Sequence, residues 1–206
     1  MSKTAKTLVD KIMAKMLSGV VDTEKAEQAI RDLLEAFNIE NRPGMEETPA
    51  RVVKMLEEVW QGELYTNVEL ALAYNKTFPC QSRGLVVVKD IDCFSYCEHH
   101  LALIYDMKIS IGYYPKDRVI GLSKLARIAD MCSKRLQLQE RIGSDIFDVL
   151  QQILHSSDIA IRIEANHSCM TARGIKKPGS KTVTFTKGGK FNQPAHFQEF
   201  LSAVEH

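Results

Sequence analysis

The sequence lacks an excess of charge of either sign, and it lacks long hydrophobic runs. Its 27 basic and 26 acidic residues nearly cancel, which argues against a broad surface that binds nucleic acid or membrane lipid through charge. No apolar stretch is long enough to cross a bilayer, and lysines interrupt the first 17 positions, so no secretory leader is expected. Five cysteines at irregular spacing do not form a disulfide framework. We therefore expect a cytoplasmic protein in a reducing compartment, without nucleic-acid or membrane partners.

Hydrophobic periodicity divides the 206 residues into a helical first third and a mixed remainder. Apolar residues at helical spacing predict helices at 4–17 and from Asp22 to about residue 37, and a third helix opens at Thr48, which we expect to be its cap, with Pro49 in the first turn. Alternation of apolar and polar residues predicts strands in the remainder, and further helices lie between and after them. The expected strands are 85–88, 105–113, 159–165 and about 183–186, and the expected helices are 125–132, 138–154 and a short one from about residue 194. We assign 1–62 to an N-terminal helical region and 63–206 to the main domain.

This order of elements indicates an α+β fold, with helices packed on one face of a four-stranded antiparallel sheet. An open sheet of four strands leaves two edges with unpaired backbone groups, which soluble proteins normally protect. Pairing with a sister subunit would protect them. The sequence therefore predicts an oligomer.

Two distant segments offer sulfur and imidazole donors. Cys97 and His100 form a C-x-x-H pair, and His167 and Cys169 form an H-x-C pair, which together predict a shared site for zinc. In extended backbone neighbouring side chains point to opposite faces, so His99 and His100 are not expected to reach one ion, whereas His167 and Cys169 share a face. The spacing selects no third ligand and leaves both a structural and a catalytic site open. The other cysteines are expected to be small buried apolar residues: Cys80, Cys93 and Cys132.

A glycine turn at Gly121 leads into a predicted helix whose first turns carry Ser123, Lys124 and Arg127. Helix N-termini attract anions, and the two cations would add formal charge, so this segment is a candidate phosphate site. The alternative is a capped, solvated amphipathic helix. Arg173, just past Cys169, could add a further guanidinium, or it could be a surface arginine beside a turn glycine.

The segment from Gln137 to Arg141 is a dense polar cluster at the start of a predicted helix. Its carboxylate, Glu140, could accept hydrogen bonds from the N1–H and the 2-amino group of guanine. The alternative is a first-turn carboxylate that the helix dipole favours.

Together these segments closely resemble the GTP cyclohydrolase I family, in consistent order over roughly residues 20–204. The matching segments are 97–100, 119–125, 137–141, 167–170 with 173–174, 47–52 and 188–191. The resemblance implies the tunnelling fold (T-fold), in which subunits join their sheets into a barrel. It also implies a homodecamer with active sites at subunit interfaces. The implied reaction converts GTP and water to 7,8-dihydroneopterin triphosphate and formate, the first step of tetrahydrofolate and pterin biosynthesis.

The resemblance also implies how the metal and the catalytic groups are assigned. Cys97, His100 and Cys169 would bind zinc, and a water in the fourth position would attack C8 of the guanine. His167 would donate a proton to N7, and His99 would move protons during ring opening.

The substrate contacts follow from the same resemblance. Glu140, with Gln139 beside it, would hold the guanine edge, and Ser123 would act near the sugar. The triphosphate would be bound by Lys124, Arg127 and Arg173, with Arg51 and Lys54 contributed by a neighbouring subunit.

The sequence departs from the family pattern after the histidine pair, because residues 101–107 contain no glycine. The turn beside the metal could therefore differ. The sequence leaves two alternatives open. The protein could be a non-catalytic relative with a structural zinc ion, or a related enzyme that acts on another purine or pterin. Retention of His99, His167, Glu140 and Lys124 argues against the first.

Overall fold

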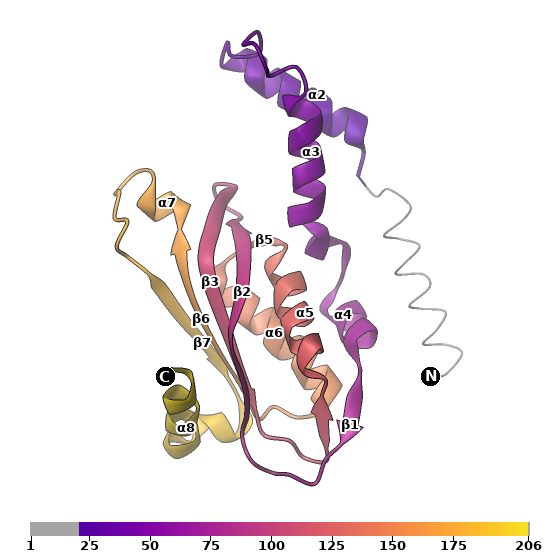
Figure 1. The fold of residues 1–206 in the computed structure, drawn as a ribbon, viewed down its shortest axis with the longest axis vertical. Helices are drawn as coiled ribbons and strands as arrows, with labels where there is room; N and C mark the ends of the chain where they lie inside the picture. Colours follow the sequence, from indigo (N-terminus) through magenta and orange to yellow (C-terminus); the bar gives the residue numbers. More distant parts are fainter. Residues whose placement is uncertain (1–20, 206) are drawn as a thin grey trace, which may run out of the picture. The chain divides into compact units, whose positions relative to one another are not determined.

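The computed structural model describes residues 21–205 (Figure 1). Contacts divide the chain into two compact units, the first ending at Leu64 and the second beginning at Tyr65. The assignment of 1–62 and 63–206 as domains stays a prediction, and the helix expected at 4–17 lies outside the described residues. None of the helices in the described residues combines the length and the apolar content that a bilayer crossing requires.

Within its described residues, the first unit contains two helices, α2 (Thr23–Ala36) and α3 (Thr48–Val59), which pack against each other, followed by a 3₁₀ turn, η1 (Gln61–Leu64). As predicted, Asp22 caps α2: its carboxylate accepts a hydrogen bond from the Lys25 N–H at 3.0 Å. The cap predicted for α3 was wrong by one residue, because Glu47 takes that position and Thr48 is already helical. Pro49 lies in the first turn, where its missing N–H costs no hydrogen bond.

The second unit begins with helix α4 (Asn67–Tyr74) and carries the sheet. Its strands are β1 (Thr77–Pro79), β2 (Val86–Cys97), β3 (Ala102–Tyr113), β4 (Arg118–Ile120), β5 (Leu136–Gln137), β6 (Ile159–His167) and β7 (Thr182–Lys187). Its remaining helices are α5 (Leu122–Ser133), α6 (Gln139–Leu154), α7 (Ser168–Thr171), η2 (Gly189–Asn192) and α8 (Pro194–Glu205).

Within the described residues, the main sheet has the strand order β5-β2-β3-β6-β7, and β1 pairs with β4 in a separate ribbon. The four predicted strands are present as β2, β3, β6 and β7, and they pair antiparallel. The expectation of a sheet with only four strands was wrong. The fifth strand, β5, runs parallel to β2 and pairs Gln137 with Cys97. It spans two residues, too few to produce a period that sequence analysis could detect.

Helices α5 and α6 pack on one face of this sheet, against β2 and against β6 and β7 respectively. The isoleucines on that face, including Ile109, Ile111 and Ile163, are at most 1% exposed. Gly143 lets α6 approach β7 closely, because a Cβ at this position would lie 2.4 Å from the Thr186 hydroxyl. This layer forms most of the core.

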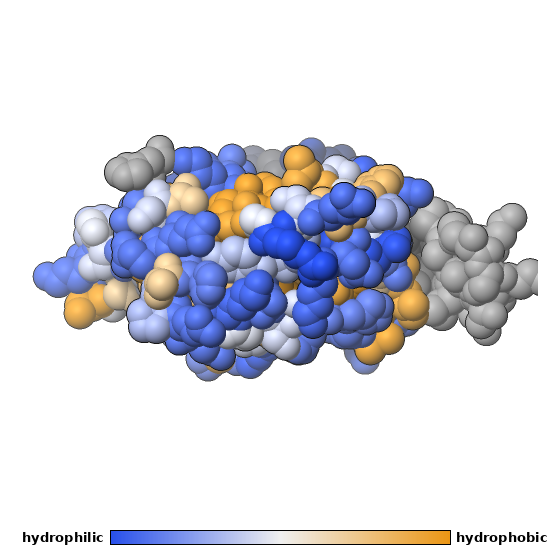
Figure 2. Space-filling view, turned by 90° about the horizontal axis from the view of Figure 1, so that it is seen from below, coloured by the Kyte–Doolittle hydropathy of each residue, from blue (hydrophilic) through white to orange (hydrophobic). Residues whose placement is uncertain are grey.

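Helix α8 lies on the opposite face, which corrects the expectation that all the helices share one face (Figure 1). A Cβ on Gly112 would lie 2.6 Å from the ring of Phe200, so this glycine provides the space in which α8 packs on β3. Phe200 joins a second buried cluster with Tyr114, Ala160 and Phe191. Figure 2 shows that the surface on the side of α8 and β1 is predominantly hydrophilic, with apolar side chains in separate groups.

We predict that Gly112→Ala lowers the free energy of unfolding by about 1–3 kcal/mol, because the added methyl group must displace the buried Phe200 ring. Urea denaturation would measure this change. The matched control is Gly84→Ala, whose new Cβ would meet only the Ser82 hydroxyl, at 3.8 Å, and which should change stability by less than about 1 kcal/mol. Equal effects of the two substitutions would contradict the proposed contact between α8 and β3.

Candidate metal centre

The first two candidate ligands lie where β2 turns into β3. Cys97 is the last residue of β2 and is buried. Its carbonyl accepts hydrogen bonds from the N–H groups of His100 at 3.3 Å and Leu101 at 2.9 Å. Leu101 has φ of 49°, a left-handed conformation that glycine adopts without strain. The turn therefore closes without the glycine that is missing here.

The third ligand comes from the end of β6. Strand pairing places His167 beside Ile104 on β3, and Cys169 follows in α7. The sulfurs of Cys97 and Cys169 and a ring nitrogen of His100 lie within 4.8 Å of one another, and the Cys97 sulfur is 3.9 Å from His100 Nδ1. The predicted convergence of these two segments is thus present in the structure.

The donor set fits a metal ion of the zinc type. Around a tetrahedral ion with bonds of about 2.0–2.3 Å, the ligand atoms lie roughly 3.5 Å apart, close to the observed 3.9 Å. Burial raises the pKa of the Cys169 thiol, and the neighbouring Cys97 raises it further, whereas Arg173 acts in the opposite direction. Ionisation of both thiols is therefore unfavourable unless a cation lies between the two sulfurs.

His167 lies beside this cluster and is held by α6. Its Nε2 is 2.8 Å from the side-chain oxygen of Gln139, the first residue of α6. Burial lowers the pKa of His167, and the nearby charge of Glu140 acts in the opposite direction. Glu140 is exposed, whereas Gln139 is only 2% exposed.

One pair of residues at this end of the sheet had been given no role by sequence reasoning. Arg141 on α6 donates two hydrogen bonds to the Glu98 carboxylate, at 2.5 and 3.2 Å. The hydrogen bond from Arg141 lowers the pKa of Glu98. Both residues fall inside motifs that sequence analysis singled out, but nothing in their spacing indicates that they meet. His99 is exposed, with its Nε2 3.9 Å from Glu98.

The predicted phosphate residues of α5 lie at the opposite end of the sheet. The N–H of Ile120, just before α5, donates to the hydroxyl of Tyr113, and Tyr113 pairs with Val86 at the start of β2. Cys97 is at the far end of that strand, roughly 35 Å away at about 3.3 Å per residue. Within one chain the structure does not bring Ser123, Lys124 and Arg127 to the cluster. Lys124 instead lies over the ring of Tyr74.

The other predicted cations are divided between the two units. Arg173 is close enough to Cys169 to influence its ionisation. Arg51 and Lys54 are exposed residues of α3 in the first unit, where Arg51 pairs with Glu47 at 2.5 Å.

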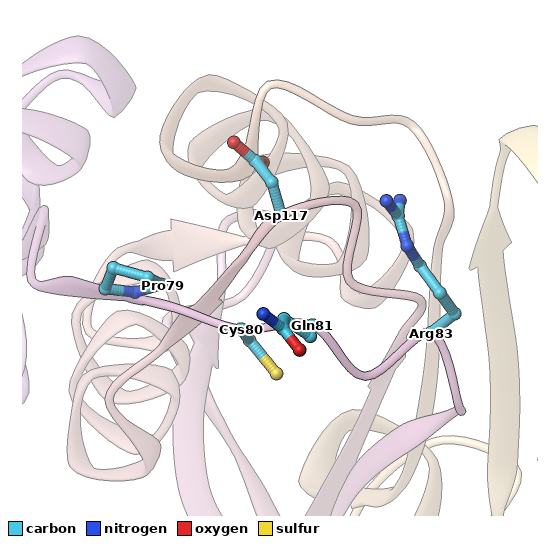
Figure 3. A pocket seen from close by; sticks show the side chains of 5 residues that line it. All are labelled: Pro79, Cys80, Gln81, Arg83 and Asp117. Carbon is cyan, nitrogen blue, oxygen red and sulfur yellow. The ribbon is translucent and has the colours of Figure 1, made fainter.

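A surface hollow of about 480 Å³ lies elsewhere in the second unit, lined by Pro79, Cys80, Gln81, Arg83 and Asp117. Figure 3 shows that the Cys80 sulfur points away from both Arg83 and Asp117. The side chains do not converge on a common point, so this hollow is not the candidate site. Of the three cysteines expected to be buried, Cys93 and Cys132 are buried, and Cys80 is partly exposed.

The fold and the site together define an α+β protein with a Cys–His–Cys metal-type cluster at one end of its sheet. A sequence profile of GTP cyclohydrolase I matches residues 26–205. The chain belongs to the GTP cyclohydrolase I family.

Curated relatives support this assignment over most of their length. The protein named GTP cyclohydrolase 1 from Ruminiclostridium cellulolyticum is 54% identical over 179 residues, which cover 83% of this chain and 91% of the relative. The protein of the same name from Clostridium botulinum strain Hall is 53% identical, over 84% of this chain and 91% of the relative. The GTP cyclohydrolase 1 from Clostridium beijerinckii is 51% identical, over 83% of this chain and 90% of the relative.

We predict that the purified protein binds one divalent ion per chain and that Cys97→Ala abolishes this binding, because it removes one of three clustered donors. Elemental analysis after dialysis would give the stoichiometry. Cys80→Ala is the matched control, since Cys80 lies outside the cluster. Retention of the full metal content by Cys97→Ala would exclude the cluster as the metal site.

Proposed function

We propose that this protein is a GTP cyclohydrolase that converts GTP and water to 7,8-dihydroneopterin triphosphate and formate. The observation that carries the proposal is the meeting of Cys97, His100 and Cys169 beside His167, in a chain that belongs to the GTP cyclohydrolase I family. A structural site alone would not need a carboxylate and a further histidine next to the ligands.

We propose that the ion is zinc, held by Cys97, His100 and Cys169, because two sulfurs and one imidazole are donors that zinc prefers. When bound with an open position, zinc supplies a water whose pKa is lowered to about 7 and which is therefore a nucleophile at neutral pH.

The residues around the cluster supply the proton transfers and the purine contacts. His167 donates a proton to N7 of guanine, which makes C8 more electrophilic, and the exposed His99 moves protons during ring opening. Glu140 accepts hydrogen bonds from the N1–H and the 2-amino group. Its exposure and its closeness to His167 support this role.

The triphosphate and sugar contacts require a second copy of the chain. Arg173 is near the cluster, but Ser123, Lys124 and Arg127 are at the other end of the sheet. A neighbouring copy that presents its own α5 end would complete the site, and Arg51 and Lys54 would come from a neighbour in the same way.

We propose a homodecamer in which sheets join into a barrel. The outer strand β7, with Val183 and Phe185 exposed, supports pairing between subunits. The cytoplasmic location stays a prediction.

With zinc and GTP, the protein should release formate and a pterin that fluoresces after oxidation. Glu140→Ala should lower kcat/KM by roughly 10²- to 10⁴-fold, because two hydrogen bonds to a charged acceptor, worth about 1.5–3 kcal/mol each, are lost. Asp148→Ala is the matched control, because Asp148 is an exposed acidic residue of the same helix. No product from folded, zinc-loaded protein would favour a structural metal site, and unchanged activity of Glu140→Ala would place the guanine elsewhere.

We predict that two inactive variants regain activity when they assemble together. One carries Cys97→Ala, and the other carries Lys124→Ala with Arg127→Ala. Random mixing leaves both halves intact at about a quarter of the interfaces, so about a quarter of the wild-type rate should return. Co-assembly of Cys97→Ala with Cys169→Ala is the control and should restore nothing, because both changes fall in the same half-site. Mixed oligomers that contain the first pair and stay inactive would show that one chain forms the whole site.

A further inference from the structure

We infer that Gln139 is a positioning residue that holds His167 in a single tautomer, with the proton on Nε2, so that Nδ1 is the atom that exchanges a proton with the substrate. This inference deepens the proposed function and rests on it for the catalytic role of His167. It moves Gln139 away from the guanine edge, where the family resemblance had placed it.

The contacts of the Gln139 side chain fix the orientation of its amide. The amide nitrogen donates to the carbonyl oxygens of Ile163 and Thr182, both at 3.1 Å, and lies 3.2 Å from the Thr184 hydroxyl. Carbonyl oxygens only accept hydrogen bonds. A flipped amide would place its own oxygen against two carbonyl oxygens and would leave both carbonyls without the donor that they have here. The nitrogen must therefore face the sheet.

The amide oxygen then faces His167. Its distance to Nε2 is 2.8 Å, a hydrogen-bond distance, and an amide oxygen can only accept. Nε2 must carry the hydrogen. In the neutral ring the other nitrogen, Nδ1, is then an unprotonated acceptor, and it can donate to N7 of guanine only after it has itself taken up a proton. Because the two strand carbonyls determine the orientation of the amide, the tautomer is determined by the sheet itself.

The position of Gln139 is fixed as firmly as its orientation. It is 2% exposed at the first position of α6. The first two turns of this helix are tied to α4 and β5 through Asp145, which accepts hydrogen bonds from Asn67 of α4 at 3.1 Å and from Gln137 of β5 at 2.7 Å. With its amide hydrogens donated to the sheet, the Gln139 side chain has no donor left for a purine. The exposed Glu140 stays available for that contact.

The test compares Gln139→Met with Gln137→Met. Methionine keeps the length of the side chain and removes the amide. Gln137 is the matched control because it is also buried, and its side-chain amide donates to Cys132 and Asp145 rather than contacting His167. The readouts are solid-state NMR of the full-length, zinc-loaded protein labelled with ¹⁵N in its histidine rings, and steady-state kinetics with GTP. The signals of His167 are identified by their loss in His167→Asn.

In the wild-type protein at a pH where the ring is neutral, His167 should show a persistent proton bonded to Nε2 and an unprotonated Nδ1. Gln139→Met should lose that persistent proton and lower kcat by roughly 10- to 100-fold, with KM for GTP nearly unchanged, because only the placement of the ring is affected. Gln137→Met should keep the wild-type pattern of His167, whatever stability it loses.

A proton on Nδ1 of wild-type His167 would overturn the inference, and this measurement does not require Gln139→Met to fold. A raised KM with unchanged kcat in Gln139→Met would also overturn it, because that result identifies a substrate contact. If the wild-type protein does not turn over GTP, the proposed function fails, whereas the tautomer is still read from the spectrum. The two failures are therefore distinguishable.

Discussion

The register of β3 between β2 and β6 is the constraint on which the site depends. Cys97 pairs with Ala102 at one edge of β3, and Ile104 pairs with His167 at the other. A shift by one residue would turn every side chain of a strand to the opposite face. It would also carry Ile109 and Ile111 out of the core, at a cost of roughly 1.5–3 kcal/mol for each side chain. The hydrophobic layer beneath α5 and α6 therefore holds the Cys–His–Cys cluster in place, although none of its isoleucines belongs to that cluster.

The start of α6 is the second organising element. The side chains of its first three residues have different surroundings. Gln139 contacts His167, Glu140 is exposed, and Arg141 binds Glu98. Successive residues of an α-helix point about 100° apart, so one helical turn can reach the histidine, the proposed guanine site and the turn after β2 at once. The short strand β5 fixes this start against β2, since Gln137 pairs with Cys97 and its carbonyl accepts the Glu98 N–H at 3.2 Å.

The two functional ends of the sheet do not meet within one chain. The sulfur–imidazole cluster with Arg173 lies at one end, and the helix start with Ser123, Lys124 and Arg127 lies at the other. The ordered sheet keeps these two ends apart, so the nucleotide site proposed above would need a neighbouring copy. Oligomerisation would then serve the chemistry as well as the protection of a sheet edge.

The sequence by itself determined the type and order of the main elements and the chemistry of the ligands. Alternation located β3 and β6, and helical spacing located α5 and α6. The family resemblance, rather than spacing alone, indicated the three residues that the structure brings together, Cys97, His100 and Cys169. Strand β5 was not predictable, because two residues carry no period, and α8 was assigned to the wrong face, because the space that Gly112 leaves for Phe200 depends on packing between distant segments. Only the tertiary structure decided that Glu98 binds Arg141 and that Gln139 faces His167. Hydrogen bonds between residues 28 and 43 positions apart depend on strand register and helix placement, which local sequence does not encode.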